Sequence, residues 1–271
     1  MGQKKFEILC VTMHQNDFSK LKEMNVHSDI VYANQCNHTS YEELCFDGEH
    51  TAKMISTQTR GVGINRNTAL MYAEGEICLF ADDDVVYCDD MEEKVVREFD
   101  NHPDADIFIF NLTTDDEKRK QKQYKKTRRC TPWEKMPWAG FRIAIRLNSV
   151  RKANIWFTTL FGGGCVFPSG EDSMWLLDAK RKGLRLCVSE EVIGQVSFAA
   201  STWFTGHDES FFFGKGAFYA AVHPRTFYLW AIYFVLRTSF DRSLTDREKM
   251  KWLRFGREGY RKCLPFSGFL G

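Results

Sequence analysis

Three adjacent aspartates, Asp82, Asp83 and Asp84, follow the apolar run 77–81. A short apolar run bounded by polar residues predicts a strand that is covered on both faces. Neighbouring carboxylates raise each other's pKa unless a cation or a basic group offsets their charge. Asp82 and Asp84 would point to the same side of an extended chain, where they could share one divalent ion. The alternative is a solvated acidic turn or a helix N-cap.

Residues 59–67 precede the acidic strand and combine Gly61 and Gly63 with Arg60 and Arg66. Glycine lets the backbone approach a phosphate, the start of a helix presents free N–H groups, and the arginine guanidinium matches phosphate geometry. The segment therefore predicts an anion-binding helix start, with a Gly-rich loop carrying solvated arginines as the alternative. Neither a G-x-G-x-x-G motif nor a P-loop is present, which disfavours a dinucleotide-binding or kinase-like phosphate site.

A second acidic pair, Glu171 and Asp172, follows Gly170 at the start of a predicted helix. Two carboxylates there could simply complement the helix dipole. A metal-dependent group transfer, however, needs a second acidic site, because one site holds the leaving phosphate and the other deprotonates the attacking hydroxyl. Asp172 is therefore a candidate general base. His207, among aromatic residues, is a candidate metal ligand or a hydrogen-bonded surface residue, and Lys215 is expected in a polar loop.

The elements that must position these residues alternate along the chain. The apolar patterns predict strands at 6–12, 30–33, 53–55, 77–81 and 106–112, with helices at 65–73 and 90–99. Further strands are expected at 141–147 and 184–188, with a helix at 173–182. This alternation predicts an α/β fold with a mostly parallel central sheet and right-handed crossovers.

Length and composition fit an ordinary globular protein. The chain has 271 residues, of which 44% are hydrophobic and 27% charged, enough for one large or two small domains. The formal net charge of +1 excludes a general attraction to nucleic acid. Because the start lacks an apolar signal core and the cysteines form no C-x-x-C pair, we expect a cytoplasmic protein.

The C-terminal third raises the question of membrane contact. The apolar run 227–236 is about half the length needed to span a membrane as a helix. The aromatic segment 219–240 could lie in a membrane interface or cover the sheet edge as a buried helix, and residues 245–262 predict a basic amphipathic helix. The basic tract 118–129 could attract an anionic lipid or a pyrophosphate-linked acceptor, or be a solvated loop.

The order of these motifs resembles the inverting, metal-dependent glycosyltransferases of the GT-A fold, in particular the large family 2 that builds bacterial polysaccharides. Residues 6–14 resemble the first nucleotide-binding strand of that family, and residues 60–67 resemble its Gly-rich helix start with Arg and Asn. Residues 80–84 resemble its D-x-D strand end, and residues 170–172 resemble its acidic acceptor-site motif. The resemblance covers roughly residues 6–215.

The resemblance implies a role for each matching residue. Asp82 and Asp84 would lie at the donor diphosphate, with Asp84 as the direct ligand of Mg2+ or Mn2+ and Asp83 as the variable middle position. Asp172 would accept the acceptor proton, Glu171 would position the acceptor or support the loop, and His207 would complete the metal shell. The remaining donor-binding residues would be Thr12, Asn34, Arg60, Gly63 and Arg66, either arginine facing the nucleobase or the diphosphate. The family often has Asp where this chain has Asn34.

The predicted organisation is a nucleotide-sugar-binding half at 1–114, a basic mobile segment at 115–129, an acceptor-binding half at 130–215 and a C-terminal helical extension at 216–271. The resemblance implies transfer of a sugar from a UDP-sugar to a glycan or lipid-linked oligosaccharide in capsule or lipopolysaccharide synthesis, by an enzyme that contacts the inner face of the membrane. The alternatives are a sugar nucleotidylyltransferase, whose usual Arg-Lys-bearing loop near the N-terminus is absent, and a non-catalytic module that binds polyanions through residues 118–129.

Overall fold

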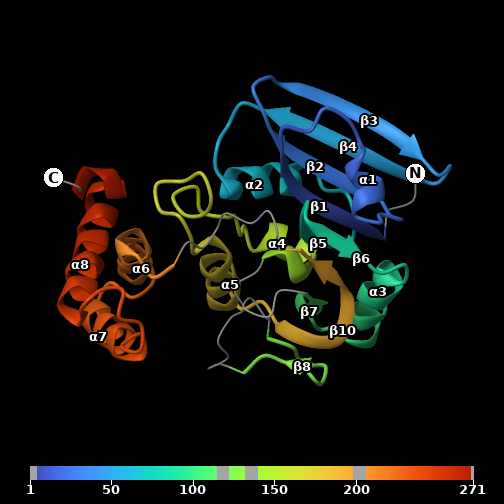
Figure 1. Cartoon of the computed structure of the whole chain (residues 1–271). Coiled ribbons are helices and arrows are strands. Elements are labelled where there is room, and N and C mark those ends of the chain that lie inside the picture. Colours follow the sequence, from blue (N-terminus) through green and yellow to red (C-terminus); the bar gives the residue numbers. More distant parts are fainter. Residues whose placement is uncertain (1–4, 115–121, 132–139, 198–205, 270–271) are drawn as a thin grey trace. The chain divides into compact units, whose positions relative to one another are not determined.

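The computed structural model of the chain describes residues 5–114, 122–131, 140–197 and 206–269 (Figure 1). The chain divides into two compact units. The first unit contains Met1–Thr158 and Asp172–Ala200, and the second contains Thr159–Glu171 and Ser201–Gly271. The segment that carries Glu171 and Asp172 thus passes from one unit to the other. The functional division predicted from the sequence follows other boundaries and stays a prediction.

A ten-stranded sheet forms the centre of the first unit. Its strands lie in the order β3 (Ser40–Phe46), β4 (His50–Thr57), β2 (Ile30–Gln35), β1 (Phe6–Met13), β5 (Ile77–Asp82), β9 (Ile143–Arg146), β7 (Ile107–Thr113), β10 (Leu186–Val196) and β6 (Val85–Tyr87), and β8 (Arg128–Arg129) pairs with β10. The four strands β4, β2, β1 and β5 are parallel to their neighbours within this group, as are β7 and β10. The α/β fold with a largely parallel centre is confirmed.

Strands β9, β3, β6 and β8 differ from the predicted pattern, since the last three were not predicted at all. The segment 141–147 begins with a short 3-10 helix, η2 (Gly140–Arg142), and β9 is antiparallel to both β5 and β7. The edge strand β3, antiparallel to β4, was missed, because its side chains are mostly exposed and show no apolar pattern.

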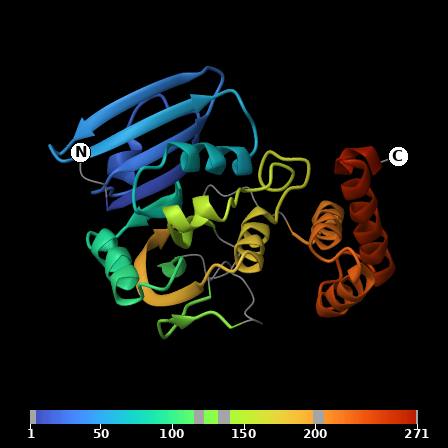
Figure 2. The same cartoon turned by 180° about the vertical axis from the view of Figure 1, so that it is seen from behind.

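Helices cover both faces of the sheet (Figures 1 and 2). These helices are α1 (Lys20–Glu23), α2 (Val62–Tyr72), α3 (Met91–Asn101), α4 (Leu147–Lys152) and α5 (Glu171–Arg181). Neighbouring residues of β1 enter different cores: Ile8 belongs to the same buried cluster as Phe99 of α3, whereas Leu9 belongs to the cluster that contains Leu70 of α2 and Trp175 of α5. This alternation follows from the two-residue period of a strand that is buried on both faces.

The basic tract enters the core at one position. We expected residues 115–129 to contribute almost nothing to a core, but Tyr124 is buried in the cluster that contains Leu9. Its backbone N–H donates to Asn111 Oδ1 at 2.8 Å, and the Arg142 guanidinium lies 5.4 Å from the ring centroid. Residues 115–121 of the tract lie outside the described part of the chain.

The second unit is helical and contains α6 (Glu209–Val222), α7 (Phe227–Arg237), α8 (Asp246–Lys262) and the 3-10 helix η3 (Phe266–Phe269). Asp208 caps α6 and Thr245 caps α8, as expected for helix starts. A Cβ added at Gly216 would lie 2.1 Å from the Leu253 carbonyl oxygen, and one at Gly256 would lie 1.9 Å from that of Phe213. Glycine at both positions therefore lets α6 and α8 pack backbone to backbone.

Candidate active site

The candidate donor-binding residues lie at the carboxyl ends of the parallel strands. Thr12 of β1 is paired in register with Asn34 of β2, and Val11 is paired with Asp82 of β5. The chain proceeds from β1 to β2 and β4 on one side, and only later adds β5 on the other side. Strand order thus reverses between β1 and β5, and such a reversal is where open α/β sheets bind ligands.

The aspartate triplet joins β5 to β6 through a tight turn. Asp82 is the last residue of β5, and Asp83 and Asp84 form the turn before Val85. Our argument from an extended chain is therefore wrong, because a turn and not a strand follows Asp82. The Asp83 carboxylate accepts a hydrogen bond from the Thr12 hydroxyl. This bond ties the triplet to the end of β1.

Asp84 has the environment of a cation ligand. Burial, and then the charges of Asp82 and Asp83, raise the pKa of Asp84 to about 7. Its Oδ1 is shielded from solvent and accepts no hydrogen bond from any residue within the described ranges. Burial also raises the pKa of Asp82, against the opposing effect of Arg66. A divalent ion would relieve both effects, so the carboxylates present fit Mg2+ or Mn2+.

Among the described residues no group of three or more His, Cys, Asp or Glu side chains could hold a metal by itself. Mg2+ in nucleotide-dependent enzymes is often held by one or two carboxylates together with substrate phosphates. Asp82 at the end of β5 and Asp84 in the turn would suffice for such a site when the donor is bound.

Arg66 connects the triplet to the second acidic motif. This residue lies in α2 with a side chain that is only 3% exposed, and its Nη2 donates to Asp82 Oδ1 at 3.2 Å. Its Nη1 is hydrogen-bonded to Asp172 Oδ1. The Arg66 guanidinium also lies over the Phe157 ring, 5.3 Å from the centroid. One buried cation thus brings together two carboxylates that are ninety positions apart in the sequence.

Asp172 is held from two sides. Besides the Arg66 contact, its Oδ2 accepts a hydrogen bond of 2.7 Å from the backbone N–H of Gly140. Sequence reasoning missed Gly140, because a backbone donor leaves no residue-type signal. A Cβ there would lie 2.6 Å from Asp172 Oδ1, so a side chain would displace the carboxylate. Helix α5 carries Asp172 and is anchored by Trp175, whose ring contacts Phe80 and Phe157 at 5.6 Å and 5.2 Å between centroids.

Helix α2 is fixed by its asparagines and by a close approach. Asn65 donates to the carbonyl oxygens of Thr12 at 3.2 Å and Ala33 at 2.7 Å, so it bridges the ends of β1 and β2. A Cβ on Gly63 would lie 2.1 Å from the Thr158 carbonyl oxygen. The glycine predicted to bind the donor therefore also permits tight packing. Asn65 was not among our site residues, although its place beside Arg66 in a polar helix start was a usable signal.

Asn34 and Arg60 occupy the outer part of this sheet edge. Asn34 is fully buried, and its side chain bonds the backbone of Gln15 in both directions, at 2.9 and 3.0 Å, and donates to Ser56 Oγ at 3.0 Å. Arg60 is exposed and donates to the Cys36 carbonyl oxygen at 2.8 Å. Asn34 thus shapes the loop that follows β1, and Arg60 holds the loop that follows β2.

Glu171 and His207 belong to the second unit. Glu171 is buried, and the backbone N–H of Gly170 donates to its Oε2 at 3.1 Å. His207 Nδ1 is paired with the Asp241 carboxylate, whose pKa is lowered to about 2 by the backbone N–H of Ser243 and then by His207. The assignment of His207 to the metal shell and of Glu171 to the acceptor stays a prediction.

Comparison with known proteins agrees with this geometry. Residues 39–164 match the model described as "Glycosyl transferase family 2". Among solved structures, residues 1–349 of S. aureus TarS share 16% identity with this chain at a TM-score of 0.59, over 97% of this chain and 93% of that one.

The same protein fragment in complex with UDP-GlcNAc gives 15% identity and a TM-score of 0.56 over 97% of this chain and 93% of that one. A further TarS structure, whose description gives no residue range, matches 97% of this chain at 16% identity and a TM-score of 0.56, and this chain covers 44% of it. No curated protein matches. Residues 39–164 are thus similar to family 2 glycosyltransferases, and the chain as a whole has a fold similar to that of TarS, in agreement with the GT-A resemblance drawn from the sequence.

Proposed function

We propose that the chain is a metal-dependent, inverting glycosyltransferase that moves a sugar from a UDP-sugar to a hydroxyl of a glycan, with a lipid-linked oligosaccharide in surface-polysaccharide synthesis as the acceptor. One observation carries the proposal. The buried guanidinium of Arg66 holds Asp82, from the strand end, and Asp172, from the acidic motif, in one cluster. The UDP and UDP-GlcNAc complexes of TarS, a protein of similar fold, support the choice of UDP.

The residues divide the chemistry between leaving group and nucleophile. Asp84 and Asp82 would hold Mg2+ or Mn2+, which supplies charge neutralisation for the departing nucleoside diphosphate. Arg66 lies beside Asp82 and would supply a fixed positive charge next to that diphosphate. The pairing of Thr12 with Asp83 keeps the turn against the end of β1, where the nucleotide would bind.

Asp172 would act on the acceptor. Each carboxylate oxygen has two lone-pair positions, so the bonds to Arg66 and Gly140 orient the group and leave positions for the proton of the acceptor hydroxyl. The hydroxyl oxygen attacks the anomeric carbon as the bond to the diphosphate breaks, and Asp172 takes the proton. Attack opposite the leaving group inverts the anomeric centre, by the geometry that separates inverting from retaining glycosidases.

Calorimetry and a donor screen test this function. We expect UDP to bind in the presence of Mn2+ and the binding to weaken strongly when the metal is chelated. UDP-, GDP- and dTDP-sugars, offered with Mn2+ or Mg2+, should be hydrolysed with a preference for the UDP-sugars. Formation of a UDP-sugar from UTP and a sugar 1-phosphate would instead make the chain a nucleotidylyltransferase, and metal-independent binding would contradict the role of Asp84.

The acceptor and the place of the reaction need a second measurement. Within the part of the chain that the structure describes, no helix has the length and apolar character needed to cross a membrane. The proposal for the place of the reaction comes from the resemblance: a cytoplasmic enzyme that meets its acceptor at the inner membrane face. Radiolabelled sugar should appear in a chloroform-extractable product when membranes are supplied, and its appearance only in water-soluble glycan would contradict the lipid-linked acceptor.

A further inference from the structure

Helix α7 is apolar on all sides. Its buried residues are Phe227, Ala231, Phe234 and Val235. The opposite side also carries apolar residues, which form the exposed stripe Leu229, Ile232, Tyr233 and Leu236. The spacing of three and four residues places these four side chains on one helix face. Leu229 is 69% exposed and Leu236 is 65% exposed, and Phe240 beyond the helix end is 76% exposed. A helix that is apolar all round normally has an apolar environment on every side.

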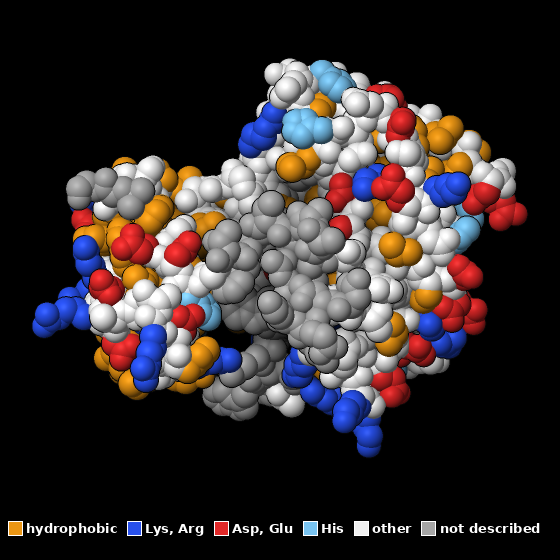
Figure 3. Space-filling view, viewed as in Figure 1, with side chains coloured by type: hydrophobic (Ala, Val, Ile, Leu, Met, Phe, Trp, Pro, Cys, Tyr) orange, Lys and Arg blue, Asp and Glu red, His pale blue; other side chains and the backbone are white. Residues whose placement is uncertain are grey.

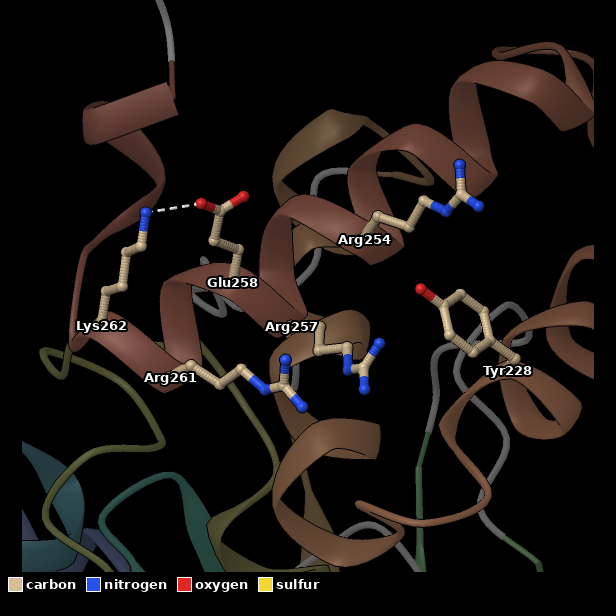
Figure 4. Close-up of a pocket in the computed structure, with 6 residues that line it drawn as sticks. All are labelled: Tyr228, Arg254, Arg257, Glu258, Arg261 and Lys262. Carbon is tan, nitrogen blue, oxygen red and sulfur yellow. Dashed lines mark hydrogen bonds and ion pairs between the residues drawn. The ribbon is translucent and has the colours of Figure 1, made fainter.

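Basic side chains lie beside this stripe. Arg254, Arg257 and Arg261 of α8 line a cavity of about 350 Å³ together with Lys262, Glu258 and Tyr228 of α7. Figure 4 shows Tyr228 pointing from α7 toward the arginines. The guanidinium carbon of Arg257 lies 5.0 Å from the centroid of the Tyr228 ring, and that of Arg254 lies 5.7 Å from it. Because Ile232 of the stripe lies four residues after Tyr228, on the same side of α7, the cavity adjoins the stripe.

The three arginines lack carboxylate partners among the residues that the structure describes, since the one acidic residue in the cavity, Glu258, is paired with Lys262 at 2.6 Å. Four cations therefore face one carboxylate. Figure 3 shows basic and hydrophobic side chains together on the visible face of the α6–α8 unit. Guanidinium groups stacked on aromatic rings and left without an acidic partner favour an anion, and their planar fork matches phosphate.

We propose that the α7 stripe and the α8 arginines form a docking surface for an anionic phospholipid bilayer, with headgroup phosphates at the cavity and the stripe among the acyl chains. The surface needs a partner that is apolar and anionic at once. A soluble polyanion would satisfy the arginines and leave the stripe in water, whereas a second copy of this surface would bring arginines against arginines. Exposed apolar surface beside unpaired cations is typical of interfacial helices.

The length of α7 sets how it would bind. Its 11 residues span about 16 Å as a helix, whereas the hydrocarbon core of a bilayer is about 30 Å thick. The helix would therefore lie in the membrane plane. Trp230 stacks on His223 with 4.5 Å between ring centroids and is 38% exposed, which suits a residue at the headgroup level. This docking surface rests on the proposed function, because a lipid-linked acceptor gives the enzyme a reason to bind a membrane.

Flotation of the full chain with vesicles tests the surface. We expect it to bind vesicles of phosphatidylcholine mixed with phosphatidylglycerol, to bind phosphatidylcholine alone more weakly, and to be released in part by high salt. Leu229→Ser with Leu236→Ser should lower the partition coefficient by at least about tenfold, the effect of burying a single leucine. Arg254→Gln with Arg261→Gln should lower it by about thirtyfold on anionic vesicles only.

Matched controls use exposed residues elsewhere. Met71→Ser removes an exposed apolar side chain of α2, and Lys22→Gln with Lys152→Gln removes two exposed charges. Neither control should change vesicle binding. Lipids brominated in the acyl chains should quench the tryptophan fluorescence of the wild type, and Trp230→Phe should remove most of that quenching without preventing flotation.

Three outcomes would overturn the docking surface. The first is no flotation with anionic vesicles, and the second is equal flotation of the wild type and the Leu229→Ser/Leu236→Ser variant. The third is inorganic polyphosphate that displaces the protein from vesicles and binds the leucine variant as well as the wild type. A lipid-free dimer that disappears in the leucine variant would replace the membrane by a second copy. Calorimetry with UDP and Mn2+ separates this inference from the proposed function. If the wild type floats but does not bind UDP, the proposed function is wrong and the docking surface is retained. If the wild type binds UDP but does not float, the docking surface is wrong and the transfer from a UDP-sugar is retained.

Discussion

Arg66 in the first unit and three arginines of α8 in the second unit have opposite surroundings. In the first unit the buried Arg66 is enclosed by carboxylates, and each partner comes from a different element of the fold. In the second unit Arg254, Arg257 and Arg261 share one helix face and have no carboxylate within ion-pair distance among the described residues. A buried charge must have partners because desolvation is costly, whereas an exposed charge can remain available to a ligand.

This difference separates a site that is made by topology from a surface that is made by local periodicity. The carboxylates Asp82 and Asp172 meet only because the sheet brings β5 next to β1 and because α5 packs on the same face as α2. The stripe of α7, in contrast, requires nothing beyond a helix with apolar residues at the right spacing. Substitutions in the candidate active site should therefore break long-range contacts, whereas substitutions in the α7 stripe should remove its surface without affecting the fold.

The largest expected effect is the loss of the base. Asp172→Asn should reduce kcat of sugar transfer by about a hundredfold to ten-thousandfold, because an amide cannot accept the hydroxyl proton. Single-turnover kinetics with saturating donor would measure it. Asp178→Asn is the matched control, since Asp178 lies on the same helix and forms an exposed pair with Lys182. Near-normal transfer by Asp172→Asn would remove the general base from this cluster.

The next effect concerns the metal. Asp84→Asn should lose most Mn2+-dependent UDP binding, because the amide oxygen carries no charge to hold the ion. In the wild type, UDP with Mn2+ should raise Tm, and a chelator should cancel the shift; in Asp84→Asn both should be nearly absent. The control is Asp90→Asn, an exposed carboxylate close in sequence that pairs with Lys94. An equal shift in the Asp84 variant would place the ion elsewhere.

The sequence predicted the parts that depend on local pattern. The strand before the triplet, the α2 helix start and the amphipathic helix α8 follow from apolar periodicity and glycine. It also placed Asp82 and Asp172 in one site, but only through the ordered motifs of the family. Neither route revealed Arg66 as their link, because the pairing depends on how far α2 and α5 lie apart across the sheet.

Three features had little or no usable local signal. Gly140 acts through its backbone N–H, which every residue except proline carries. Strand β9 inserts antiparallel between β5 and β7, and the apolar pattern of a strand does not encode its direction. Lys215, expected in a polar loop, is buried in α6, because α6 is enclosed by other parts of the second unit that are distant in sequence.

Close packing offers a third prediction, which compares the two units directly. Gly63→Ala should lower the free energy of unfolding by about 1–3 kcal/mol and weaken UDP binding, because the Cβ would meet the Thr158 carbonyl oxygen beside the site. Gly256→Ala should cost a similar amount through the α6–α8 contact but leave the affinity for UDP unchanged. Denaturant melts and calorimetry would measure both, with Gly268→Ala as a control whose nearest neighbour is at 3.9 Å. Equal loss of UDP binding in Gly63→Ala and Gly256→Ala would show that the units do not act separately.

The smallest expected effect comes from Lys215, which with Lys249 is one of two buried lysines among the described residues of the second unit. Burial lowers its pKa from 10.5 to about 8, although Glu171 opposes the shift. Between about pH 8 and pH 10.5 the native state has lost a proton that the unfolded chain keeps. Stability therefore rises with pH across this window. Below the window, the folded protein bears the full cost of the buried charge. The slope should not exceed about 1.4 kcal/mol per pH unit, the limit for one proton. Lys215→Met should remove this component, measured as the difference between urea melts of the two proteins from pH 7 to pH 10.5. If the free energy of unfolding of both proteins has the same slope against pH, Lys215 keeps its proton in the folded state. Contacts with neighbouring groups would then stabilise this buried charge, as they do for Arg66 in the first unit.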